Sequence, residues 1–115
     1  MTTAAEVAVE RQGETVVAHL NGEVDMTNAA YVGDELRSSV PNDATALVVD
    51  LSATRYIDSA AISLLFELAR RLSRRRQSLR LVVPASSPLS RVLEITEINT
   101  TAEIHESVDS ALAAE

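Results

Sequence analysis

The chain has 115 residues, 46% of them hydrophobic, and a formal net charge of −7 at pH 7. This length predicts one domain over residues 1–115, and the lack of cysteine excludes disulfides and thiolate metal sites. The negative charge argues against nucleic-acid binding, because phosphate backbones attract basic surfaces. No apolar stretch approaches the ~20 residues that span a bilayer, and no signal peptide is recognisable. We therefore expect a cytoplasmic protein without membrane insertion.

The first elements predicted along the chain are a hairpin and a helix. Residues 6–22 alternate between apolar and polar side chains on both sides of a turn at 12–13, which predicts two strands. Residues 27–40 carry apolar side chains three and four positions apart, which predicts a helix with Thr27 as its N-cap. Gly33 inside this helix costs about 1 kcal/mol relative to alanine, which favours a close contact with another helix at that point.

The middle of the chain predicts two buried strands around a long helix. The apolar run at 45–52 is typical of a strand covered on both faces, and the run at 79–83 is similar. Between them, residues 59–76 have an amphipathic pattern with one apolar stripe. The residues of that stripe are Ile62, Leu64, Leu65, Phe66, Leu68, Ala69 and Leu72.

The C-terminal third predicts a helix at 86–95, with Ser87 as N-cap and Pro88 in the first turn. A short strand at 103–105 and a last helix at 107–114 follow. The complete order is β-β-α-β-α-β-α-β-α, which predicts an α/β fold with covering helices. We expect a mixed sheet with the first strand antiparallel at its edge and right-handed crossovers elsewhere.

This order predicts where a functional surface lies. Loops that leave parallel strands gather at one end of the sheet, where α/β proteins tend to place their sites. Three segments leave predicted strands, namely 21–27, 52–59 and 84–88. We therefore expect Asp25, Asp58 and Ser59 to share one surface.

The residues do not form a catalytic constellation. The three glycines are isolated, and Ser59 stands in Asp-Ser-Ala-Ala rather than in a nucleophile elbow. His19 and His105 are interpreted as ordinary strand residues, and Asp25 with Asp58 alone makes a weak case for a metal site. The arginine-rich run at 70–80 is interpreted as a solvated helix end, with an acidic partner or lipid headgroups as the alternative. We expect neither enzymatic activity nor a cofactor.

Ser59 admits two interpretations. A serine is a good helix N-cap, and an aspartate beside it suits the positive end of the helix dipole. Alternatively, a phosphate on Ser59 would meet free backbone N–H groups and add about −1.5 to −2 charges beside Asp25 and Asp58. Such a modification is expected to change partner binding more than the fold.

Three segments carry a resemblance to a known family. Residues 46–65 read ALVVDLSATRYIDSAAISLL, residues 20–36 read LNGEVDMTNAAYVGDEL, and residues 93–114 read LEITEINTTAEIHESVDSALAA. Together they resemble the STAS domain of bacterial anti-sigma factor antagonists over essentially the whole chain. The resemblance implies a STAS-like mixed sheet, in agreement with the order of elements predicted above.

The resemblance also implies a regulatory role in sigma-factor-dependent transcription. Ser59 matches the serine that a partner anti-sigma factor with serine kinase activity phosphorylates, and a phosphatase reverses the modification. The unphosphorylated protein would bind the anti-sigma factor, and ATP and Mg²⁺ would belong to that partner. The implied partner-binding residues are Asp25, Thr27, Asp58, Ser59, Ala60, Ala61 and Ser63.

One departure and two alternatives accompany this interpretation. The family usually has glycine where this chain has Ala61, whose methyl group is expected to lie where a partner packs and to affect kinase recognition.

The first alternative is a STAS subunit of an ABC-type lipid-transport complex that docks on its ATPase. The second is a ligand sensor or small-molecule enzyme that uses Asp25 and Asp58.

Overall fold

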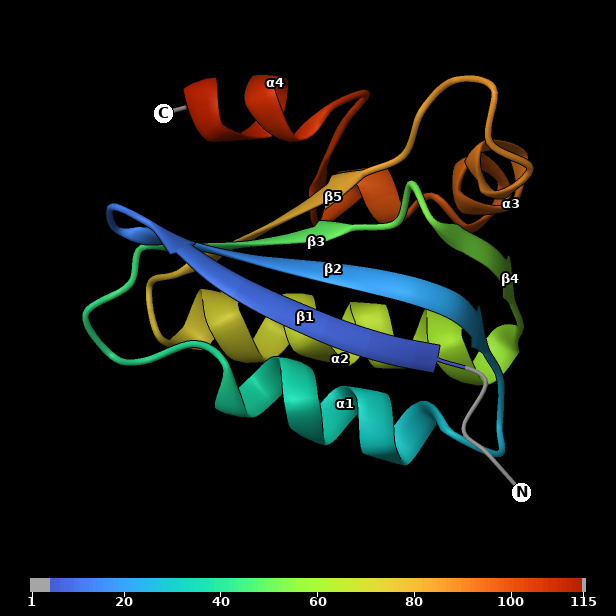
Figure 1. The fold of residues 1–115 in the computed structure, drawn as a ribbon, viewed down its shortest axis with the longest axis horizontal. Helices are drawn as coiled ribbons and strands as arrows, with labels where there is room; N and C mark the ends of the chain where they lie inside the picture. The colour runs from blue at the N-terminus through green and yellow to red at the C-terminus, as the bar shows by residue number, and fades with distance from the viewer. Residues whose placement is uncertain (1–4, 115) are drawn as a thin grey trace.

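The protein folds as a six-stranded mixed sheet with helices on both faces (Figure 1). The computed structural model describes residues 5–114. The strands are β1 Ala5–Gln12, β2 Thr15–Val24, β3 Ala46–Asp50, β4 Thr54–Ile57, β5 Ser78–Val82 and β6 Glu103–His105. The helices are α1 Ala29–Ser38, α2 Ser59–Arg74, α3 Leu89–Thr96 and α4 Val108–Ala113, with a 3-10 turn η1 at Ile98–Thr100.

The strand order β1-β2-β3-β5-β6 confirms the predicted α/β architecture. β1 pairs antiparallel with β2 at the edge, whereas β2, β3, β5 and β6 run parallel to one another. Gly13 supplies the positive φ of 64° that the tight turn between β1 and β2 requires. The carboxyl ends of the parallel strands therefore lie at one end of the sheet, as the sequence predicted.

β4 is a strand that the sequence analysis assigned to a loop. It pairs parallel with Gly22, Glu23 and Val24 at the end of β2, with a register shift between Gly22 and Glu23. The buried Thr54 hydroxyl donates to the Leu20 carbonyl and fixes the start of this strand. With only four residues, two of them exposed, β4 lacks a hydrophobic pattern of its own. Thr54, Tyr56 and Ile57 favour extended backbone, but so short a segment becomes a strand only through its pairing with β2.

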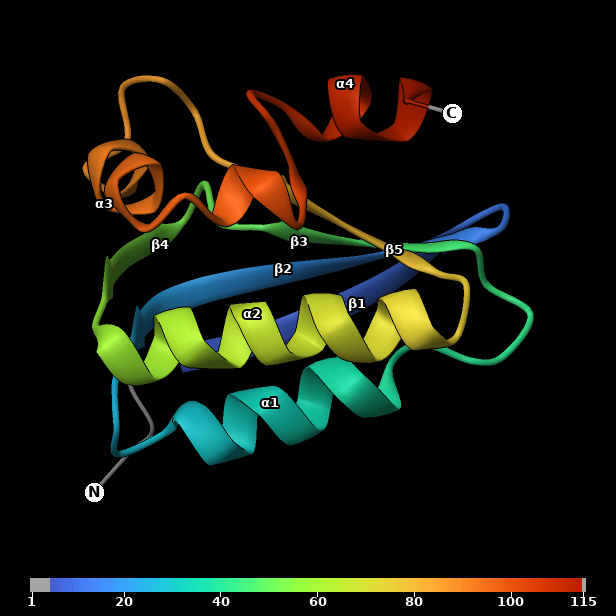
Figure 2. The same cartoon turned by 180° about the vertical axis from the view of Figure 1, so that it is seen from behind.

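Two apolar layers hold the helices on the sheet (Figure 2). α1 and α2 cover one face, and the buried side of α2 matches the predicted stripe except that Ile62 and Phe66 are only half-buried. α4 packs on the other face over Val17, Val48 and Val82. β3 lies between these layers and is buried at every position, as expected for a strand covered on both sides.

Gly33 lies at the contact between α1 and α2, as predicted. A Cβ atom at this position would lie 2.9 Å from Leu64 Cδ1. The missing side chain therefore lets the two helices approach closely. The N-cap prediction for α1 is wrong, however: Thr27 precedes Asn28, which occupies the cap position without a side-chain cap bond.

The helix predicted at 86–95 begins three residues later in the structure. α3 starts at Leu89, whose N–H donates to the Ser87 hydroxyl at 3.1 Å, with Pro88 in the cap position. The prediction of Ser87 as N-cap and Pro88 as the first helical residue is therefore wrong by one position, although the Ser87 hydroxyl does accept from the first N–H of the helix; the residues before Leu89 form a turn. None of the helices within residues 5–114 is long and apolar enough to cross a membrane.

Candidate functional site

The loop after β2 and the loop after β4 are joined by hydrogen bonds, so the predicted convergence of Asp25, Asp58 and Ser59 is confirmed. The Met26 N–H donates to Asp58 Oδ2 at 3.0 Å. The Asp58 N–H donates to the Val24 carbonyl at 3.2 Å. Residues more than thirty positions apart in the sequence thereby form one continuous surface at the end of the sheet.

Asp58, and not Ser59, caps α2. Its Oδ1 accepts from the N–H groups of Ala60 at 2.9 Å and Ala61 at 3.1 Å, and its backbone is extended, as is usual at an N-cap. Ser59 is the first residue of the helix, and its side chain is exposed. The interpretation of Ser59 as the cap is therefore wrong. An aspartate one residue earlier satisfies the same donors and leaves the serine hydroxyl accessible.

Asp25 is held by Thr27. The Thr27 hydroxyl and the Thr27 N–H both donate to Asp25 Oδ1. The hydroxyl hydrogen bond, followed by that of the N–H, lowers the pKa of the Asp25 carboxyl below its ordinary value. Asn28 fixes the same loop, because its Oδ1 accepts from the Asp25 N–H and its Nδ2 donates to the Glu23 carbonyl. Thr27 thus orders an anionic loop instead of capping a helix.

Ala61 does not contribute a side chain to this surface. Its side chain is only 2% exposed and packs in the main core, whereas Ser59 and Ser63 are exposed and Ala60 is half-buried. The expectation that the methyl group of Ala61 lies where a partner packs is therefore wrong. The helical geometry of α2 turns position 61 toward the sheet.

Met26 is a residue of this surface that the sequence analysis missed. Its side chain is 78% exposed, although its backbone is fixed to Asp58. Exposed methionine is typical of adaptable binding surfaces. Its place in a loop between two acidic or polar residues was the available signal in the sequence.

A shallow groove runs from this surface between α1 and α2. It has a volume of ≈ 450 Å³, and four of the residues that line it have small side chains, whereas Arg37, Glu67 and Arg70 add charge. Those small residues are Ala29, Ala30, Ala60 and Ser63. The groove gives the surface a recess into which side chains of another protein could fit.

The third predicted loop, 84–88, lies at the same end of the sheet. It lines a small depression together with residues 52–55, at the start of β4. The described contacts of Asp25 and Asp58 do not include this loop. It therefore borders the surface on the side of β4 and α3.

His19 was expected to be an ordinary strand residue, but it connects two carboxylates. Its Nδ1 lies 2.7 Å from Asp50 Oδ2, and its Nε2 lies 2.7 Å from Glu10 Oε2. The hydrogen bond with Glu10, followed by that with Asp50, raises the pKa of His19. Burial alone would raise the pKa of Asp50, but hydrogen bonds from Ser52 and His19 outweigh it and lower that pKa.

Among residues 5–114, no group of three or more histidine and carboxylate side chains is arranged to hold a metal ion.

The fold and this surface define a class of protein: an α/β domain whose exposed serine lies on a polar surface at the carboxyl ends of its strands. The profile of the STAS domain matches residues 6–111. The chain belongs to the STAS domain family.

Several known proteins are similar to this chain. The anti-sigma-F factor antagonist RsfB of Mycobacterium tuberculosis is 26% identical over 107 residues, which cover 92% of this chain and 85% of RsfB. An anti-sigma factor antagonist from Mycobacterium paratuberculosis shares the fold with a TM-score of 0.83 at 24% identity, over 94% of this chain and 91% of that protein. The antagonist SpoIIAA in its unphosphorylated form has a TM-score of 0.71 at 18% identity, over 93% and 94% of the two chains. The phosphorylated form of SpoIIAA, from Bacillus, has a TM-score of 0.63 over 93% and 96%.

Proposed function

We propose that this protein is a cytoplasmic anti-sigma factor antagonist that binds an anti-sigma factor and is released when that partner phosphorylates Ser59. Binding would free a sigma factor, so that the protein regulates transcription without contacting DNA. The names of the similar proteins support the antagonist role, and family membership supports a regulatory domain. The binding surface would comprise Asp25, Thr27, Asp58, Ser59, Ala60 and Ser63, with Met26 added to it.

The observation that carries this proposal is the position of the Ser59 hydroxyl. Ser59 is exposed at the first position of α2, directly after the aspartate that joins the two loops. A kinase can reach this hydroxyl without unfolding the helix, because Asp58 already satisfies the cap. The Asp58–Met26 hydrogen bond joins the loop after β2 to the residue before Ser59, which supports a binding surface that includes both.

The hydrogen bonds of α2 indicate how a phosphate would act. The N–H groups of Ala60 and Ala61 already donate to Asp58, and that of Ile62 donates to the Asp58 carbonyl. A phosphate on Ser59 therefore finds few free donors in the first turn, contrary to the expectation from sequence. It instead adds negative charge beside the carboxylates of Asp58 and Asp25, where like charges repel. We expect the added negative charge to weaken binding of the partner at this surface while the fold stays intact.

The alanine at position 61 is compatible with this mechanism. Because its side chain packs inside the core, it leaves the surface around Ser59 unobstructed. The departure from the usual glycine then affects the packing of α2 more than the approach of a kinase.

Phosphate transfer with purified components tests the proposal. The protein is incubated with Mg²⁺-ATP and each anti-sigma kinase of its source organism, and intact-mass spectrometry counts the phosphates. We expect one phosphate with the cognate kinase and none on the variant Ser59→Ala. Ser38→Ala is the control, since Ser38 is an exposed serine at the end of α1, outside the proposed binding surface, and its replacement should leave the transfer unchanged.

Binding measurements complete the test. Isothermal titration with the cognate anti-sigma factor should show tight binding of the unmodified protein and a loss of at least tenfold for Ser59→Asp. Transfer that persists in Ser59→Ala would remove Ser59 from the mechanism. If no anti-sigma factor binds and the protein instead copurifies with an ABC-type ATPase, the lipid-transport alternative replaces the proposal.

A further inference from the structure

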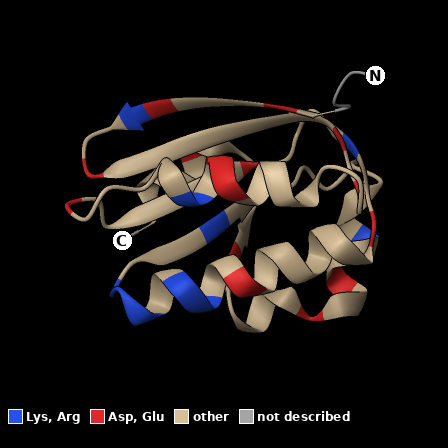
Figure 3. Cartoon of the chain, turned by 90° about the horizontal axis from the view of Figure 1, so that it is seen from below, with Lys and Arg blue, Asp and Glu red and all other residues tan. Residues whose placement is uncertain are grey.

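The C-terminal end of α2 carries a concentration of positive charge that the proposed function does not use. Half of the ten arginines fall within residues 70–76, in a chain with a net charge of −7. Figure 3 shows these blue segments crowded at one end of α2, while red segments are distributed over the rest of the molecule. α2 has 16 residues, so this end lies roughly 20 Å from Ser59, about two Debye lengths at physiological salt.

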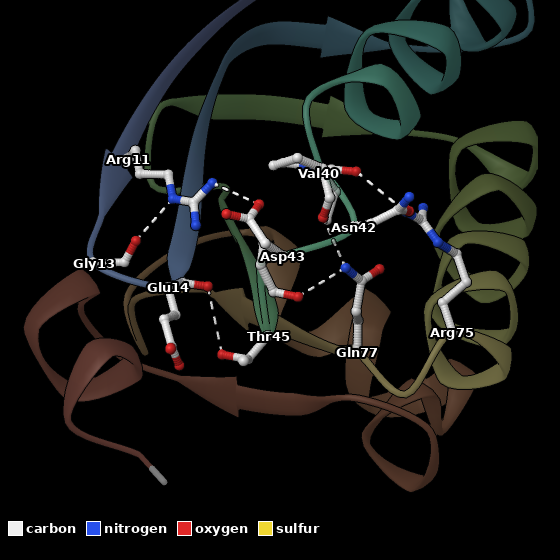
Figure 4. A network of polar contacts seen from close by, with 11 residues as sticks. Arg11, Gly13, Glu14, Val40, Asn42, Asp43, Thr45, Arg75 and Gln77 are labelled. Carbon is white, nitrogen blue, oxygen red and sulfur yellow. Dashed lines mark hydrogen bonds and ion pairs between the residues drawn. The ribbon is translucent and has the colours of Figure 1, made fainter.

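Arg75 has a structural role, because its guanidinium group is hydrogen-bonded within the fold, so it is not counted among the arginines available to a ligand. Its Nη2 donates to Asn42 Oδ1 at 2.6 Å and to the Val40 carbonyl at 3.4 Å, which ties α2 to the segment after α1 (Figure 4). Gln77 completes the same link by donating to the carbonyls of Pro41 and Ala44. These contacts secure the end of the helix without the remaining arginines.

Arg70, Arg71, Arg74 and Arg76 are the arginines that remain, and we refer to them as the arginine surface. All four are exposed, and none forms an ion pair with any residue in the described range 5–114. By contrast, Arg11, Arg37, Arg55 and Arg80 each have a carboxylate within 4.0 Å. The helix dipole favours cations in the last turn, which includes Arg71 and Arg74, whereas Arg70 lies just before that turn.

A groove opens beside the arginine surface. It has a volume of ≈ 450 Å³, with Arg70, Ser73 and Arg74 on one wall and Thr100 and Thr101 on the other. It adjoins a second depression of ≈ 320 Å³ whose lining includes Asn99 and Glu103; the Glu103 carboxylate disfavours an acidic ligand there, so the peptide is expected in the groove beside Arg70 and Arg74. The Thr100 and Thr101 hydroxyls donate to backbone carbonyls, so the arginines and the Ser73 hydroxyl supply the free donors of the groove. Guanidinium groups bind carboxylates in a planar, bidentate manner.

We propose that the arginine surface and its groove bind an acidic polypeptide segment of a partner protein. Charge complementarity identifies the ligand, since unpaired guanidinium groups line a recess that would hold a short chain carrying carboxylates. A membrane is a poorer match. The large apolar side chains exposed in residues 5–114 lie outside both residues 69–77 and residues 98–101, so neither segment supplies an apolar anchor for the bilayer. Arg74 and Arg76 are remote from Ser59, but Arg70 also lines the groove between α1 and α2 that includes Ala60 and Ser63, so the two sites adjoin at Arg70. The proposal does not depend on phosphorylation of Ser59.

A titration of the full chain with a synthetic acidic peptide tests this site. The peptide alternates glutamate and serine over eight residues, and ¹⁵N-labelled protein is followed by NMR at low salt. We expect saturable shifts confined to residues 69–74 and 99–102, and weaker binding as salt increases. The variant Arg70→Glu/Arg74→Glu should lose about tenfold in affinity, since an exposed ion pair changes affinity about two- to fivefold. Arg70→Gln/Arg74→Gln tests the same loss with less disturbance of the helix end.

The matched control is Arg55→Glu/Arg91→Glu, which changes the net charge equally at two exposed arginines elsewhere. It should retain affinity within about twofold. Equal weakening by both glutamate pairs, or shifts spread over all arginines, would overturn the proposal. So would cosedimentation with phosphatidylglycerol vesicles that Arg70→Glu/Arg74→Glu abolishes in the absence of peptide binding, because the ligand would then be a lipid surface. Self-association lost in that variant would assign the site to a second copy.

Discussion

The aspartate at the start of α2 offers a sharp test of how this site is built. Asp58→Ala removes the acceptor for the Ala60 and Ala61 N–H groups and for the Met26 N–H of the neighbouring loop. Loss of the cap costs about 1 kcal/mol, and loss of the partly exposed loop hydrogen bond adds about 0.5–1 kcal/mol. We therefore expect the free energy of unfolding to fall by about 1.5–2 kcal/mol, which lowers the Tm by about 6–8 °C for a chain of this length.

Urea unfolding followed by circular dichroism measures this change. Asp58→Asn is the matched control: its amide oxygen can still cap the Ala60 and Ala61 N–H groups, but its NH₂ group cannot accept from the Met26 N–H, so it should lose only the loop hydrogen bond, about 0.5–1 kcal/mol. Ser107→Ala removes the cap of the short helix α4, where the Ser107 hydroxyl accepts from the Ser110 N–H, and provides a reference for a cap that does not join two loops. If Asp58→Ala were as stable as Asp58→Asn, the assignment of Asp58 as cap and loop clamp would be refuted.

Three further predictions address other parts of the fold. The raised pKa of folded His19 means that its contribution to stability is complete below its unfolded pKa of about 6.5 and is lost as the pH rises through the folded value. Urea unfolding between pH 5.5 and 9 should therefore show a decline that His19→Gln removes, and parallel profiles would contradict it. Arg76 has a φ of 61°, so Arg76→Gly should raise the free energy of unfolding by about 0.5–1 kcal/mol; a lower value would mean that its side chain supports the fold. Leu93→Ala should cost about 2–5 kcal/mol because its side chain is fully buried, whereas Ile95→Ala, 70% exposed, should change stability by less than about 0.5 kcal/mol, and similar losses would contradict the packing of α3.

The elements with strong hydrophobic patterns were predictable from the sequence. The apolar run at 45–52 became β3, and the amphipathic stretch at 59–76 became α2, because burial of their side chains dominates both. β4 has no such pattern and arises only from pairing with the end of β2. The topology also allowed the convergence of the two loops to be predicted, since parallel strands place their exits together.

The cap of α2 shows what local sequence could not decide. Both Asp58 and Ser59 are good N-cap residues, and only the backbone angles and the loop beside them select the aspartate. The same is true of Ala61, whose side chain could face a partner or the core until the helix is docked on the sheet.

The sequence by itself determined the order of elements apart from β4, the family, and the segment in which the candidate switch serine lies, because periodicity and local chemistry are recorded in short stretches of residues. The tertiary structure decided which polar groups meet. It brought Met26 to Asp58, connected His19 to both Glu10 and Asp50, and left the arginine surface without partners in the described chain. These contacts join residues on different strands and helices, and their formation depends on strand register and helix docking that no local pattern specifies.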